Sequence, residues 1–135
     1  MLPSIDMYNS IYKHMFYIIY FLISFSFLFS FDYSNNQKAV ENLKSKSKIL
    51  IDNANFELAL SLYLKILDFE KNIYSEDSIE IAKTYDQIAN LYIQLNNYSA
   101  ALPYLKKSIN IYEKNILRPK DSLLSSLRNM SIIYE

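Results

Sequence analysis

From residue 37 onward, apolar residues recur at spacings of three and four, the spacing of one face of an α-helix. This pattern predicts five helices, over residues 37–52, 55–73, 77–95, 98–116 and 119–134. Asn-rich joints at residues 53–55 and 96–97 separate helices that would lie antiparallel to each other. The pattern therefore predicts an all-α fold of antiparallel helical hairpins.

The apolar pattern also repeats itself. The segment F-x-x-A-L that begins at Phe56 returns 42 residues later as Y-x-x-A-L at Tyr98. A period of about 20 to 50 residues is typical of arrays in which one supersecondary unit has been copied. A repeat array of this kind indicates binding rather than catalysis.

Small residues at fixed places in the repeat indicate how the hairpins pack. The backbones of two antiparallel helices approach closely only where one helix presents a small side chain. Ala59 and Ala101 provide such places on second helices, and Ala89 does so on a first helix. Large residues at helical spacing fill the space around them. The residues assigned to this packing are Phe56, Ala59, Tyr63, Tyr85, Ile88, Ala89, Tyr92, Tyr98, Ala101, Leu105, Leu127, Met130 and Tyr134.

The clearest copy has the spacing of a known family motif. It reads Y-x-x-I-A-x-x-Y from Tyr85, then A-x-x-x-L from Ala101, and resembles the W-x-x-L-G-x-x-Y and A-x-x-x-F of the tetratricopeptide repeat. Part of the motif recurs at residues 127–134, whereas Lys46 stands where the first copy needs an apolar residue. The period of 42 residues exceeds the family's usual ~34. The chain is therefore similar to the long-helix variant found in kinesin light chains and many bacterial scaffold proteins.

The resemblance implies a right-handed superhelix whose concave surface is lined by the first helix of each hairpin. It implies a scaffold or adaptor that binds a protein or peptide there. The residues on that surface outside the packing pattern are Lys83, Asp86, Asn90, Ile93, Gln94, Arg128 and Ile132. Simple solvation of these side chains is the alternative. Asp86 stands where some members have a basic or amide group, so their basic clamp for C-terminal carboxylates is not reproduced.

Residues 15–31 have a different character, because this uncharged run carries six of the eight phenylalanines. As a helix of 17 residues it would span about 26 Å, a little less than the ~30 Å hydrocarbon core of a membrane. Lys13 and His14 precede the run and Asp32 follows it, which predicts that the repeats lie outside the cytoplasm. We expect their location to be the bacterial periplasm. We expect residues 1–35 to be a signal peptide or a signal anchor, with a buried core helix as the alternative, and residues 36–135 to be the repeat domain.

Composition excludes several classes of site. The chain has no glycine and no cysteine, so it has no Gly-rich phosphate loop, thiol nucleophile or zinc-thiolate site. His14 is the only histidine, and the carboxylates are scattered. We therefore expect no enzyme, no cofactor and no metal. Without glycine, we expect turns with positive φ to use Asn, Asp or Ser at the two Asn-rich joints.

Charge gives one local signal. The 14 basic and 14 acidic residues balance, so we expect no nucleic acid partner. A local basic excess in the first predicted helix consists of Lys38, Lys44, Lys46 and Lys48. A solvated face explains this excess, and contact with an acidic partner or a membrane surface is the alternative.

The last predicted helix has an apolar edge for which the sequence offers no cover. This edge consists of Leu123, Leu127, Met130 and Tyr134. We expect self-association through this helix, or a longer array beyond Glu135. The alternative function to a scaffold is the sensory or regulatory part of a larger membrane-anchored signalling protein that continues beyond Glu135.

Overall fold

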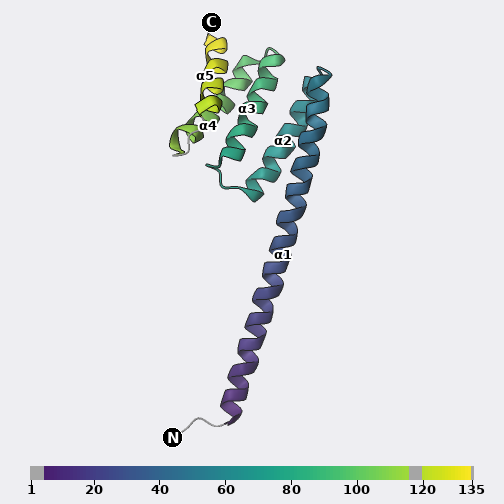
Figure 1. Cartoon of the computed structure of the whole chain (residues 1–135), viewed down its shortest axis with the longest axis vertical. Coiled ribbons are helices and arrows are strands. Elements are labelled where there is room, and N and C mark those ends of the chain that lie inside the picture. Colours follow the sequence, from purple (N-terminus) through teal and green to yellow (C-terminus); the bar gives the residue numbers. More distant parts are fainter. Residues whose placement is uncertain (1–4, 116–119, 135) are drawn as a thin grey trace. The chain divides into compact units, whose positions relative to one another are not determined.

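A computed structural model describes residues 5–115 and 120–134, and these residues form five α-helices and no strand. The helices are α1 (Ile5–Asp52), α2 (Phe56–Ile73), α3 (Ile79–Gln94), α4 (Tyr98–Lys114) and α5 (Lys120–Tyr134). The chain divides into two compact units, Met1–Asn35 and Asn36–Glu135. In the second unit, α2, α3 and α4 each pack against the next helix along the chain (Figure 1). The predicted all-α fold with packed consecutive helices is confirmed.

Four of the predicted helices agree with the structure to within two residues where their ends are described, but the first is much longer than expected. The sequence predicted a start at residue 37, whereas α1 is helical from Ile5. Residues 32–36 contain neither glycine nor proline, so no residue type there interrupts a helix. The predicted end at Ile116 and the predicted start at Pro119 lie outside the described residues.

The two Asn-rich joints have the same backbone geometry. At the second joint, the N–H groups of Asn96 and Asn97 donate to carbonyls in the last turn of α3 at 2.9 and 2.8 Å, and Asn96 has a φ of 55°. At the first joint, Ala54 and Asn55 make the matching bonds at 2.9 and 2.8 Å. This is a left-handed helix end of the Schellman type. We expected Asn, Asp or Ser to take the positive φ at each joint. This expectation was wrong at the first joint, where Ala54 has a φ of 56°. The end of α1 determines which residue becomes left-handed, and Ala54 stands at that place.

The predicted small-residue contacts lie at the centre of the second unit. Ala59 packs in the same buried cluster as Ala82, and Ala89 packs with Ala101 and Leu105. All five side chains are inaccessible to solvent. Close approach of the helix backbones at these alanines therefore builds the core of the hairpins.

Aromatic rings fill the space beside the alanines, although not all the predicted ones do. Tyr85 and Tyr92 of α3 both pack against Tyr104 of α4, with ring centroids 6.0 and 5.8 Å apart. Tyr98 was also expected to fill the core, but it is 40% exposed because it begins α4 at the end of the hairpin. Leu127 and Tyr134 are likewise exposed.

In the first unit, the side chains described within residues 12–28 are exposed, except for half-buried Ser24. Within the described residues, one helix, near the N-terminus, is long and apolar enough to cross a membrane. This finding rests on length and composition alone, and a signal sequence meets the same criteria.

Candidate functional site

The residues predicted for the partner surface fall into two groups. Lys83 and Gln94 on α3, and Arg128 and Ile132 on α5, are exposed. Asp86, Asn90 and Ile93 are only half-buried, and each has contacts inside the fold.

Asp86 is held by side chains from the next two helices. Its Oδ2 accepts a hydrogen bond from the Tyr112 hydroxyl of α4 at 2.8 Å, and its Oδ1 accepts one from the Ser126 hydroxyl of α5 at 2.6 Å. Burial raises the pKa of Tyr112, and the bond to Asp86 raises it further, so Tyr112 remains a protonated donor. A carboxylate with both oxygens occupied in this way joins three helices.

A carboxylate also joins three helices one repeat earlier, but there it belongs to the second helix of the hairpin. Glu70 of α2 is fully buried, and its two oxygens accept from Lys44 Nζ of α1 and Thr84 Oγ1 of α3, both at 2.6 Å. The members of the two sets correspond at a spacing of 42 residues: Lys44 to Asp86, Glu70 to Tyr112 and Thr84 to Ser126. We call each set of three side chains a polar tie. Sequence reasoning missed both ties, although this 42-residue spacing was a signal that could have identified them.

Beside the first tie there is a hollow of about 320 Å³ between the C-terminal part of α1, α2 and α3. Its lining residues are Lys44, Lys48, Ile51, Tyr63, Lys83, Thr84 and Gln87. Lys48 and Lys83 are exposed, and neither ammonium forms an ion pair within the described residues. The hollow therefore joins Lys83, which the sequence predicted as a partner contact, to Lys48 of the basic first helix. Lys48, Lys44 and Gln87 were absent from the predicted surface.

The corresponding place in the second repeat is not basic. Lys48 corresponds to Asn90 and Gln87 to Asn129, each 42 residues later. The side-chain amide of Asn129 donates to the side-chain carbonyl of Asn90, so these two groups satisfy each other. Lys83 corresponds to Ser125. At these corresponding positions, only the first hollow carries unpaired positive charge, from Lys48 and Lys83.

The chemistry available at the hollow is recognition of anionic and polar groups. Burial raises the pKa of Tyr63, and the nearby charge of Glu70 raises it further, so its hydroxyl is a neutral hydrogen-bonding group at physiological pH. Among the described residues, no group of three His, Cys, Asp or Glu side chains could hold a metal ion.

Comparison with known proteins identifies a family. The family described as "Tetratricopeptide repeat" matches residues 38–114, which is more than half of the chain. This range contains the first polar tie, the hollow and both alanine contacts. No curated protein matches the chain.

Proposed function

Because the chain belongs to the tetratricopeptide repeat family, a repeat scaffold that mediates interactions between proteins, we propose that it is a scaffold or adaptor module. It binds a segment of another protein on the surface formed by its first helices, which are residues 37–52 of α1, α3 and α5. Repeat arrays of this type build extended concave surfaces that suit a long partner segment. The stacked hairpins with a 42-residue period support a right-handed superhelix of the long-helix variant.

One observation carries the choice of partner: two unpaired ammonium groups border the same hollow. Lys48 and Lys83 come from different helices and are exposed beside it. Ammonium groups form charge-assisted hydrogen bonds with carboxylates. The hollow also offers apolar surface from Ile51 and polar groups from Gln87. This combination suits an extended peptide that carries Asp or Glu next to an apolar side chain.

Selection from a random-sequence peptide library tests this proposal directly. The full chain in a mild detergent is expected to enrich acidic peptides, and Lys48→Ala combined with Lys83→Ala should weaken their binding about tenfold or more. The matched control removes two exposed lysines from second helices, with Lys71→Ala and Lys106→Ala. This control has the same change of net charge and should bind like the wild type. Enrichment of peptides without acidic residues, or equal losses in both double variants, would contradict the proposal.

The first unit supports a further part of the proposal, in which residues 1–35 direct or anchor the repeats to a membrane. The exposed aromatic side chains of residues 12–28 and the length of the apolar helix support this role. The repeats then lie outside the cytoplasm, since Lys13 precedes the apolar run. Protease added to intact cells should degrade the repeats once any outer barrier is opened. Repeats that stay protected until the inner membrane is lysed would show a cytoplasmic location.

A further inference from the structure

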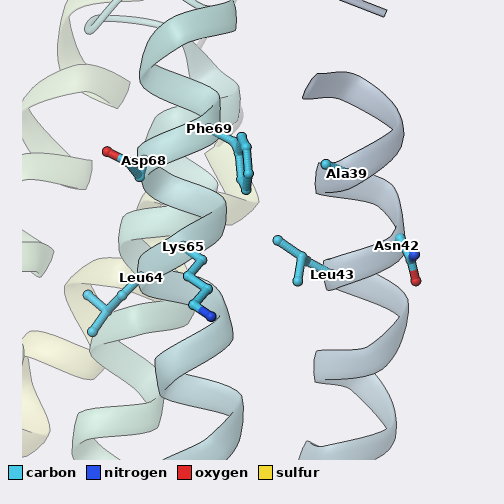
Figure 2. A pocket seen from close by; sticks show the side chains of 7 residues that line it. All are labelled: Ala39, Asn42, Leu43, Leu64, Lys65, Asp68 and Phe69. Atoms are coloured by element: carbon cyan, nitrogen blue, oxygen red, sulfur yellow. The ribbon is translucent and has the colours of Figure 1, made fainter. Parts of the chain in front are cut away.

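A second hollow lies on the outer side of the first hairpin. It has a volume of about 720 Å³ and lies between the C-terminal part of α1 and α2. Figure 2 shows Leu43 of α1 and Phe69 of α2 pointing into the space between the two helices. Leu64 also lines the hollow and is 39% exposed. We call this surface the α1/α2 groove; its complete lining is Ala39, Asn42, Leu43, Leu64, Lys65, Asp68 and Phe69.

The repeat shows what normally covers such a groove. The residues 42 positions after Leu43, Lys65, Asp68 and Phe69 line the corresponding hollow of the second hairpin. That hollow has a volume of only about 250 Å³, and the end of α2 and the segment after it, with Lys71, Glu76 and Asp77, also line it. Tyr85 and Ile111, which correspond to Leu43 and Phe69, are buried there at 8% and 4% exposure.

The chain also has an apolar helix face that needs cover. On α5, Leu124, Leu127 and Tyr134 are 58%, 45% and 67% exposed. They lie on one face at helical spacing, and the described residues leave all three exposed. The positions 42 residues earlier, Ala82, Tyr85 and Tyr92, pack against neighbouring helices.

We propose that α5 of one copy docks in the α1/α2 groove of a second copy, so that chains associate head to tail. A single convex helix then meets a groove that, in the next repeat of this chain, is closed by the end of a helix and the segment after it. One contact covers both apolar surfaces. Lys65 and Asp68 on the groove cancel each other in charge, so no net charge opposes docking. A heterologous contact of this kind leaves a free groove and a free α5 at the two ends, and the chains can extend further.

Complementation between two blocked variants tests this arrangement in the full, detergent-solubilised chain. Leu64→Glu blocks the groove and Leu127→Glu blocks α5, and both side chains are exposed enough for the change to be tolerated by the fold. Each variant should raise the concentration at half-association about tenfold or more. An equimolar mixture of the two should form a dimer and nothing larger, because one intact groove and one intact α5 remain. Leu58→Glu, 54% exposed on α2 outside the groove, is the matched control and should associate like the wild type.

The protein mass measured by light scattering distinguishes the possible results. A mixture that forms dimers from two monomeric variants supports head-to-tail docking. Wild-type association that Leu64→Glu leaves unchanged would overturn the proposal, since it indicates pairing of α5 with α5 or contact through residues 1–35. A wild type that is monomeric at all concentrations, or a mixture that stays monomeric, would overturn it as well.

Discussion

The polar tie around Glu70 gives the sharpest test of how the repeat holds together. The Glu70 side chain is fully buried, whereas 43% of the Lys44 side chain is exposed. Removing one partner of a fully buried ion pair costs about 3–5 kcal/mol, because the other charge remains buried without compensation. Since Lys44 keeps part of its contact with water, we expect Lys44→Met to cost less, about 2 kcal/mol.

This cost should depend on the charge of Glu70. Glu70→Gln keeps the size of the side chain and an oxygen that can accept from Thr84, but it removes the charge that Lys44 compensates. In the Glu70→Gln background, Lys44→Met should therefore cost under about 0.5 kcal/mol, which gives a coupling energy of about 1.5 kcal/mol in the double-mutant cycle.

Urea unfolding followed by circular dichroism measures these differences. A loss of about 2 kcal/mol corresponds to a fall of about 1 M in the urea midpoint. The chain provides a matched control in Lys114 and Asp77, whose ion pair is 3.4 Å long with side chains 54% and 63% exposed. Lys114→Met should change stability by about 0.5 kcal/mol or less. Equal losses for Lys44→Met with and without Glu70→Gln would refute a compensating role for the lysine.

Two further predictions concern the second tie and the first joint. Burial and the bond to Asp86 raise the pKa of Tyr112 above its unfolded value of about 10. The protonated Tyr112 hydroxyl therefore stabilises the folded state fully below about pH 10, and this contribution declines at higher pH. Tyr112→Phe should lower the urea midpoint at pH 8, and the midpoint of this variant should fall less than that of the wild type between about pH 10 and 11.5. An equal fall of the midpoint in both proteins would refute the role of Tyr112. Ala54→Gly should raise stability by about 1 kcal/mol, because glycine adopts a φ of 56° without steric cost. A destabilised Ala54→Gly variant in the same urea assay would show that its left-handed backbone is not strained.

The sequence was sufficient for the features that depend on local spacing. The alanines at positions 59, 89 and 101 were identified because a small residue recurs at a fixed place, and all three are buried. The left-handed turn at Asn96 followed from residue type. Ala54 did not, because its φ is set by the end of α1 rather than by its own preference.

The sequence was insufficient where a side chain has partners far along the chain. Asp86 was predicted as a partner contact, but its two donors are 26 and 40 residues away, and only the packed helices bring them together. Glu70 was not identified from the sequence, because its partners Lys44 and Thr84 are 26 and 14 residues away. Lys48 and Lys83 lie 35 residues apart, and the hollow between them forms only when α1 and α3 pack beside α2.

Site-specific photo-crosslinking in cells tests the central claim most directly, since it asks which surface another protein touches. A photoreactive amino acid at Gln87 lies beside the basic hollow, and the same group at Lys106 lies on the exposed side of α4. The account predicts adducts with another protein from position 87 and few from position 106. Adducts from position 106 alone would contradict it, and would show that partners bind the second helices instead.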